Sequence, residues 1–213
     1  EQIGDRTRFL HGEETVNPAH ALFRNIMDLE FLGATVVGLP CNTAHAERIW
    51  SVLNDNLEQA RCRARLLDMI AETADFLNQE CPEVRTVGIL STIGTWRAAC
   101  YPALLESKGY KVVVLKEEQQ QQIHDEALFH PRHGIKVQAH PVTEKAREVL
   151  MQGVRSLESL GAEGVVLGCT EIPLGIPEYR LGKTYIVNPG RILARALIRD
   201  FQTQSLKPWN WDP

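Results

Sequence analysis

Two cysteines in this sequence stand in closely similar settings, and a thiol can act as an acid, a base or a nucleophile. The first, Cys41, lies in residues 33–45 (GATVVGLPCNTAH), and the second, Cys169, lies in residues 161–173 (GAEGVVLGCTEIP). In both stretches a Gly-Ala pair leads into a short apolar run, which is typical of a buried parallel strand. Each cysteine is therefore expected at the carboxyl end of a strand, where open α/β sheets bind ligands. The repeat predicts two half-sites that face one substrate.

The motifs PCNTAH (residues 40–45) and GCTEIPL (residues 168–174) resemble the paired signatures of the aspartate/glutamate racemase superfamily, and more closely those of its aspartate racemase branch. The resemblance runs from Asp5 to the last predicted helix. It implies a PLP-independent isomerase with two cysteines that flank the substrate α-carbon. It also implies a small acidic amino acid as substrate, a homodimer and a cytoplasmic location.

Racemisation removes the α-hydrogen from one face of the carbon and returns one to the other face. Two bases on opposite faces can do this without rearranging, so Cys41 and Cys169 are the expected catalytic pair, one as thiolate and one as thiol. A helix predicted from Ala44 would lower the pKa of Cys41 from ~8.5 by its amino terminus. By resemblance, Cys41 works on the D-enantiomer and Cys169 on the L-enantiomer. Two buried structural cysteines are the alternative.

Side chains that donate hydrogen bonds accompany both cysteines. Asn42, Thr43 and Thr170 follow them directly, and Thr92 follows a third predicted strand. By resemblance, these four residues hold the α-amino and α-carboxylate groups of the substrate. Thr95 is a further candidate, although it is equally suited to cap the helix predicted to begin near it.

Recognition of a second carboxylate needs a cation. Arg6 matches the arginine with which the family binds the aspartate side chain, and a guanidinium suits a carboxylate. Lys136, in the loop HPRHGIK (residues 130–136), resembles the family's second cation, with an ordinary exposed lysine as the alternative. Glu171 stands where the glutamate racemase branch typically has histidine, which favours aspartate as the substrate.

Other functions stay open at this point. A broad-specificity amino-acid racemase, a maleate-isomerase-like enzyme and a non-catalytic amino-acid binder of the same fold are all compatible with the motifs. Cys41 and His45 could form a metal pair, but no further ligands at zinc spacing accompany them, so no metal is predicted.

Composition narrows the class of protein. The chain has 213 residues, 44% of them hydrophobic, and a net charge of −4 without a notable basic cluster, which argues against nucleic acid as a partner. Its apolar runs are far shorter than the ~20 residues of a membrane span. Its five cysteines are irregularly spaced and predict neither a disulfide framework nor a metal motif, which fits a reducing cytosol.

The pattern of strands and helices predicts an α/β fold. Helices are expected over residues 17–33, 44–54, 69–79, 95 onward, 116–128, 143–160 and 188 onward, and strands over 34–39, 64–67, 84–90, 112–115, between 161 and 169, and 185–187. The repeated Gly-Ala-to-cysteine motif and the family resemblance imply two similar lobes. Each is a mainly parallel sheet flanked by helices, and the active site lies in the cleft between the lobes. The first lobe is predicted as residues 1–83 plus 190–213, lacking the family's amino-terminal strand, and the second as residues 84–189. One continuous doubly wound sheet is the alternative.

Overall fold

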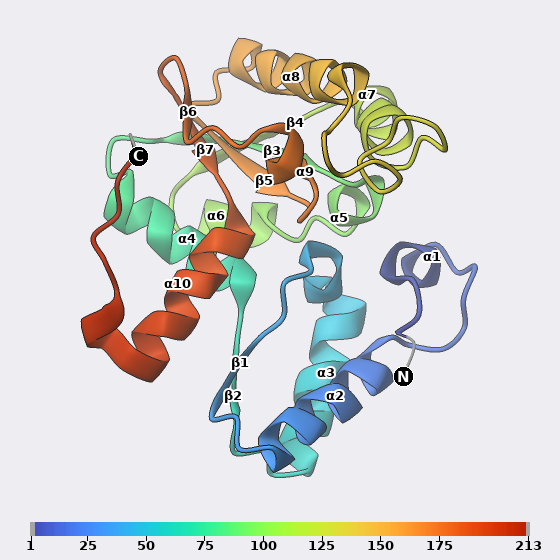
Figure 1. The fold of residues 1–213 in the computed structure, drawn as a ribbon, viewed down its shortest axis with the longest axis vertical. Helices are drawn as coiled ribbons and strands as arrows, with labels where there is room; N and C mark the ends of the chain where they lie inside the picture. Colours follow the sequence, from blue (N-terminus) through green and yellow to red (C-terminus); the bar gives the residue numbers. More distant parts are fainter. Residues whose placement is uncertain (1–2, 212–213) are drawn as a thin grey trace.

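The computed structural model describes residues 3–211, in which strands and helices alternate as predicted. The strands are β1 (Val36–Gly38), β2 (Arg65–Leu67), β3 (Thr86–Ser91), β4 (Lys111–Val114), β5 (Gly164–Gly168), β6 (Arg180–Leu181) and β7 (Thr184–Val187). They form a parallel two-stranded sheet, β1-β2, and a five-stranded sheet of order β4-β3-β5-β7-β6, in which β6 runs antiparallel to β7. Figure 1 shows the two sheets in different parts of the molecule. A single continuous sheet is therefore excluded for the described residues.

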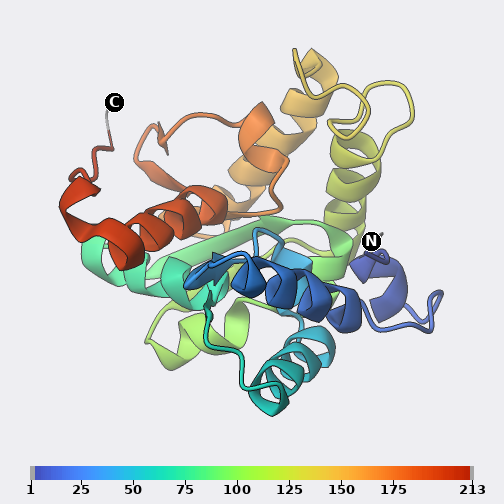
Figure 2. The ribbon, with the colours of Figure 1, turned by 60° about the horizontal axis from the view of Figure 1, so that its bottom comes forward.

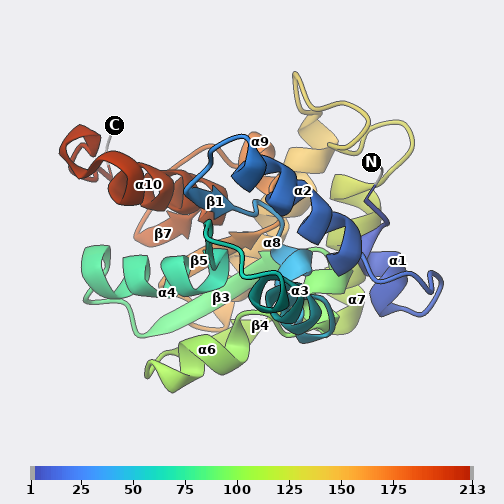
Figure 3. The ribbon, with the colours of Figure 1, turned by 90° about the horizontal axis from the view of Figure 1, so that it is seen from below.

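The helices enclose both sheets. They are α1 (Arg6–Leu10), α2 (Ala19–Phe31), α3 (Glu47–Gln59), α4 (Met69–Glu80), α5 (Ile93–Arg97), α6 (Pro102–Ser107), α7 (Glu117–Gln122), α8 (Glu144–Ser159), α9 (Ile172–Gly175) and α10 (Pro189–Gln202), with 3-10 turns η1 (Asn42–His45) and η3 (Thr203–Ser205) and a π-helical turn η2 (Ile123–Leu128). Helices α1 and α10 lie on opposite sides of the molecule (Figures 2 and 3). None of the helices in residues 3–211 combines the length and apolarity that a membrane crossing requires.

The five-stranded sheet is covered on both faces, which explains the nearly continuous apolar runs of its central strands. Leu167 of β5 packs in one cluster with Leu150 of α8, whereas its neighbour Val166 packs in another with Leu77 of α4 and Leu105 of α6. In Figure 1, α8 lies on one side of this sheet and α4 and α6 on the other. Every residue of β5 is buried.

The two-stranded sheet packs against α2 and α3, which place Leu22 and Leu53 in one cluster with Val37. Helix α10 joins the two parts, since Ile192 packs in the cluster around β3 and Leu193 packs against Leu67 of β2. Helix α4 likewise packs in both clusters, through Leu77 in the first and Met69 in the second. The predicted lobe boundaries at residues 83 and 190 remain a prediction.

Several local expectations need correction. The helix predicted from Ala44 begins at Glu47, because Ala46 is extended and only the 3-10 turn η1 follows Cys41. The helix predicted near Thr95 begins at Ile93, with Thr92 as its cap. The segment predicted as one surface helix over residues 116–128 is α7 followed by the π-helical turn η2. The break predicted between residues 56 and 80 is confirmed by β2.

Candidate active site

All nine residues predicted for catalysis or substrate binding line one cavity of about 280 Å³, near the small end of ligand cavities (~300–1,000 Å³). They are Arg6, Cys41, Asn42, Thr43, Thr92, Lys136, Cys169, Thr170 and Glu171. Asp5, Thr7, Pro40, Phe129 and Gly168 complete the lining and were not predicted from the sequence. The structure therefore brings the predicted residues together, while their chemical roles remain predictions.

Strand ends position most of these side chains. Ser91 of β3 lies opposite Gly168 of β5 in the parallel register, so Thr92 and Cys169 leave adjacent strands at the same edge of the larger sheet. Cys41 comes from the other sheet, three residues beyond the end of β1. The two thiols therefore reach the cavity from different parts of the fold.

Cys169 is held in its protonated form. Its thiol is buried, and its Sγ donates a hydrogen bond of 2.9 Å to Oε2 of Glu171. Burial, and then the charge of Glu171, raise the pKa of Cys169 well above its ordinary value. As it stands, Cys169 is a proton donor rather than a base.

Glu171 is correspondingly a carboxylate. Burial alone would raise its pKa, but hydrogen bonds from Cys169, Lys136 and Thr170, together with the Lys136 charge, lower it below the ordinary value. Lys136 is paired with Oε1 of Glu171, and Thr170 donates to Oε2 over 3.0 Å. Lys136 also lies over the ring of Phe129, at 5.0 Å from its centroid.

Cys41 lies in a different environment. It is half-buried and precedes the four-residue 3-10 turn η1, so the regular helix predicted to begin beside it is absent there. Its backbone is fixed by His45, whose Nδ1 lies 2.9 Å from the Cys41 carbonyl oxygen. The Nε2 atom of His45 accepts a hydrogen bond of 3.2 Å from the Met69 amide, so Nδ1 carries the proton and donates.

His45 is thus a positioning residue rather than a metal ligand. Burial lowers its pKa, in keeping with a neutral ring, and the ring stacks on Trp50 with centroids 4.2 Å apart. Both ring nitrogens bind backbone groups, which leaves neither for a metal. The sequence alone could not predict that the His45 ring binds the Met69 amide, because Met69 lies on α4, 24 residues away.

Polar contacts behind the cavity orient its donors. Thr43 shares a hydrogen bond of 2.8 Å with Thr95, and Thr92 donates to the same Thr95 hydroxyl over 3.2 Å. Thr95 does not line the cavity but connects the two parts of the fold from behind it. Tyr101, which is fully buried, donates its hydroxyl proton to Oδ1 of Asn42. This bond occupies the amide oxygen, so the NH₂ group of Asn42 is left to donate.

Arg6 supplies a cation that forms no ion pair with a carboxylate of the described residues. Its Nη1 donates to the Gly4 carbonyl oxygen over 3.2 Å. Helix α1, which carries Arg6, packs on α5 at Gly94, where a Cβ atom would lie 2.4 Å from Oγ1 of Thr7. Helix α1 was not predicted, because an element of only five residues is too short to show helical periodicity in the sequence.

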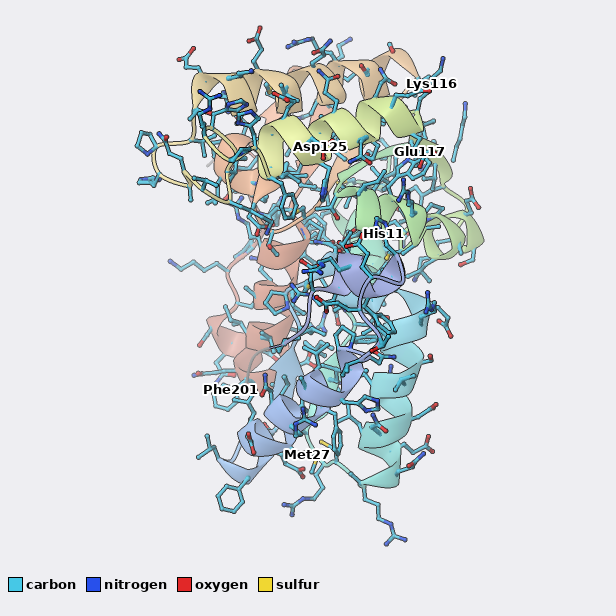
Figure 4. All side chains as sticks on the ribbon, turned by 90° about the vertical axis from the view of Figure 1, so that its right-hand side faces the viewer. His11, Met27, Lys116, Glu117, Asp125 and Phe201 are labelled. Atoms are coloured by element: carbon cyan, nitrogen blue, oxygen red, sulfur yellow. The ribbon has the colours of Figure 1, made fainter. Side chains whose placement is uncertain are left out.

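The tip of α1 also contacts the larger part of the fold. His11 lies 3.0 Å from Arg97 of α5, which pairs with Glu117 of α7. Figure 4 shows His11 between the two parts, with Glu117 above it. These contacts fix α1, and with it Arg6, against the wall of the cavity.

A group of potential metal ligands lies outside the cavity. Glu126, His130 and His133 place potential metal-ligand atoms within 4.8 Å of one another. The prediction of no metal considered the five cysteines and the Cys41 and His45 pair, but not these three residues. In the sequence, only the spacing Glu-x₃-His-x₂-His could have indicated this cluster as a possible metal site.

The chain matches known proteins over nearly its whole length. Residues 2–197 match the model of the Asp/Glu/hydantoin racemase family. An aspartate racemase of Picrophilus torridus superimposes with a TM-score of 0.73 at 24% identity, covering 93% of this chain and 75% of that one. An aspartate racemase homologue from Pyrococcus horikoshii gives a TM-score of 0.65 at 28% identity, with coverages of 85% and 73%. A glutamate racemase of Francisella tularensis gives 0.60 at 15% identity, covering 98% of this chain and 69% of that one.

Proposed function

Because the chain belongs to the Asp/Glu/hydantoin racemase family, we propose that it is a PLP-independent amino-acid racemase with aspartate as its substrate. The observation that carries the proposal is the cavity in which Cys41 and Cys169 meet from two different sheets. Two thiols that approach from separate parts of a fold can flank one carbon, whereas two thiols on one strand end cannot.

The proposed reaction is a proton transfer through the α-carbon. The thiolate of one cysteine takes the α-proton, and the thiol of the other gives a proton to the opposite face. The negative charge passes into the α-carboxylate, where Asn42, Thr43 and Thr170 are available as hydrogen-bond donors. After each turnover the thiol and thiolate have exchanged places. The protonated Cys169 corresponds to the state in which Cys41 is the base.

Two cations support an acidic substrate. Arg6 has no carboxylate partner among the described residues, so it is available for the distal carboxylate of aspartate. Lys136 is already paired with Glu171 and adds less net charge to the cavity. This division makes Arg6 the principal determinant of substrate choice in our proposal.

The proposed setting is a reducing cytoplasm, with a homodimer as the working form. The five cysteines are all free thiols in the structure, which supports a reducing compartment. Burial raises the pKa of Cys81 and of Cys100 to about 12, so these two are packing residues with little reactivity.

A racemisation assay tests the proposal. L- and D-aspartate, glutamate and alanine are followed by circular dichroism with purified full chain, no added PLP and a chelator present. We expect interconversion of aspartate in both directions and much slower reaction of alanine. Binding of aspartate without any loss of optical activity, or a strict requirement for PLP, would contradict the proposal and leave an amino-acid binder or a different enzyme.

A further inference from the structure

The cluster of Glu126, His130 and His133 contains a buried ring nitrogen without a hydrogen-bond partner. Glu126 lies on η2, and the two histidines lie on the loop that follows it. The histidine rings stack with centroids 3.4 Å apart and an interplanar angle of 19°. Nε2 of His133 is buried without a hydrogen-bond partner, although Oε2 of Glu126 lies 3.3 Å away. Buried polar atoms are rarely left unsatisfied in folded proteins.

The ring nitrogens are disposed for a shared ligand. The Arg132 amide donates a hydrogen bond of 3.2 Å to Nδ1 of His130, so Nε2 carries the ring proton; binding an ion through Nε2 displaces that proton, or moves it to Nδ1 with loss of this hydrogen bond. The ligand atoms of all three residues lie within 4.8 Å of one another, and the three side chains are only partly exposed. Atoms of ligands on one ion at ~2.0–2.2 Å lie within such a distance of each other.

We propose that Glu126, His130 and His133 bind a late first-row divalent ion such as Zn²⁺, with water in the remaining positions. Two imidazole nitrogens and a carboxylate oxygen suit this class of ion rather than Ca²⁺ or Mg²⁺, which take oxygen ligands. Lys145 competes with the ion, because its Nζ lies 3.5 Å from Oε2 of Glu126. Its side chain is 61% exposed, so it can move into solvent when the ion binds.

The bound ion would hold in place the loop that carries Lys136. The loop already folds back on η2, with the Ile135 amide donating to Ala127 over 2.9 Å and the Lys136 amide to Leu128 over 3.0 Å. An ion on Glu126 and the two histidines would cross-link the same two segments through side chains. It does not contact the cavity and takes no part in the proton transfer, so its binding is tested separately from racemase activity.

Titration of the metal-free full chain with Co²⁺, in a reductant without thiols, tests the site by visible absorption and calorimetry. We expect one ion per chain, ligand-field bands of nitrogen and oxygen ligation, and protection of residues 129–142 from hydrogen exchange when Co²⁺ or Zn²⁺ is present. Loss of even an outer partner of a metal ligand weakens binding about 10–100-fold. His133→Ala and Glu126→Gln should therefore each weaken it by about 100-fold or more.

Two further variants make the test specific. His140→Gln replaces an exposed histidine of the same loop and should leave the affinity unchanged, whereas Lys145→Met removes the competing charge and should tighten binding. The proposal is overturned by the absence of saturable binding, or by an affinity that none of these substitutions changes. An intense thiolate-to-cobalt charge-transfer band would also overturn it, because that band places the ion on cysteine.

Discussion

At the scale of single residues, the two thiols of the cavity are not equivalent. Cys169 is buried against Glu171, and Cys41 is half-buried beside a short turn. The sequence predicted both cysteines and Glu171 at the site, with Glu171 as a substrate-binding residue and a marker of substrate choice. In the structure the Glu171 carboxylate also accepts a hydrogen bond from the Cys169 thiol, and its charge raises the pKa of that thiol.

Replacing Glu171 by glutamine should make Cys169 more acidic. The negative charge that raises the pKa of the thiol is removed, while burial, the larger cause, remains, so the pKa falls without reaching its ordinary value. Alkylation of Cys169 by iodoacetamide should then begin at lower pH than in the unmodified protein. The rate is measured at each pH by mass spectrometry of the peptide that contains Cys169.

Cys81 and Cys100 serve as internal controls for this experiment, since burial keeps both thiols protonated and they should stay unlabelled. An unchanged pH profile for Cys169 in the Glu171→Gln variant would show that Glu171 does not govern its proton.

Loss of Arg6 should weaken turnover of aspartate selectively. Removing one partner of a buried charge pair typically costs ~2–5 kcal/mol, so kcat/KM for aspartate should fall at least about 30-fold in Arg6→Ala. Lys136→Ala should act in the same direction but less strongly, since Lys136 is shared with Glu171. Steady-state kinetics with aspartate and with alanine measure the difference.

Alanine has no distal carboxylate and should respond little to Arg6→Ala. Arg8→Ala is the matched control, because Arg8 lies on the same helix but pairs with Glu13 at the surface. An equal fall in kcat/KM for aspartate and for alanine would show that Arg6 does not recognise the side chain of the substrate.

At the scale of elements, the sequence predicted what depends on local pattern. The strands that lead to Cys41, Thr92 and Cys169 follow from apolar runs, two of them preceded by a glycine turn, and the long helices follow from periodicity. The helix start beside Cys41 was wrong because a tertiary contact decides it: the ring of His45 binds Met69 on α4. Helix α1 and the π-helical turn η2 are likewise short elements held by packing, which periodicity does not reveal.

The contact between α1 and α5 gives an element-scale prediction. In Gly94→Ala the new Cβ would lie 2.4 Å from Oγ1 and 2.9 Å from Cγ2 of Thr7, so α1 must shift and carry Arg6 with it. Overpacking of this kind typically costs ~1–3 kcal/mol. We expect a lower melting temperature and a higher KM for aspartate, measured by thermal unfolding and steady-state kinetics.

Two further variants test whether the contact between Gly94 and Thr7 causes these effects. Gly190→Ala is the control, since its Cβ would meet nothing nearer than 3.4 Å. Adding Thr7→Ala to Gly94→Ala removes the two shortest contacts and should recover part of the stability. If Gly94→Ala behaved like Gly190→Ala, the close approach of α1 would not position the site.

At the scale of the whole molecule, the cavity needs both sheets. The two-stranded sheet supplies Cys41 and the five-stranded sheet supplies Cys169, while α4 and α10 pack against both and fix their relation. The repeated motif predicted two matched half-sites, because the same apolar run and cysteine occur twice. It could not predict that Thr95 and Tyr101 support the site from behind, since their partners lie 52 and 59 residues away in the chain.

The central claim is that Cys41 and Cys169 act on opposite faces of one α-carbon. The most direct test follows the α-hydrogen of L- and D-aspartate in deuterated water, by NMR, with Cys41→Ser and Cys169→Ser. Serine keeps the shape of the side chain but is far too weak an acid to replace the thiol near neutral pH. Both variants should lose net racemisation, and any remaining α-deuterium exchange should be confined to one enantiomer in Cys41→Ser and to the other in Cys169→Ser. Racemisation at nearly the unmodified rate in either variant, or exchange of the same enantiomer in both, would contradict the account.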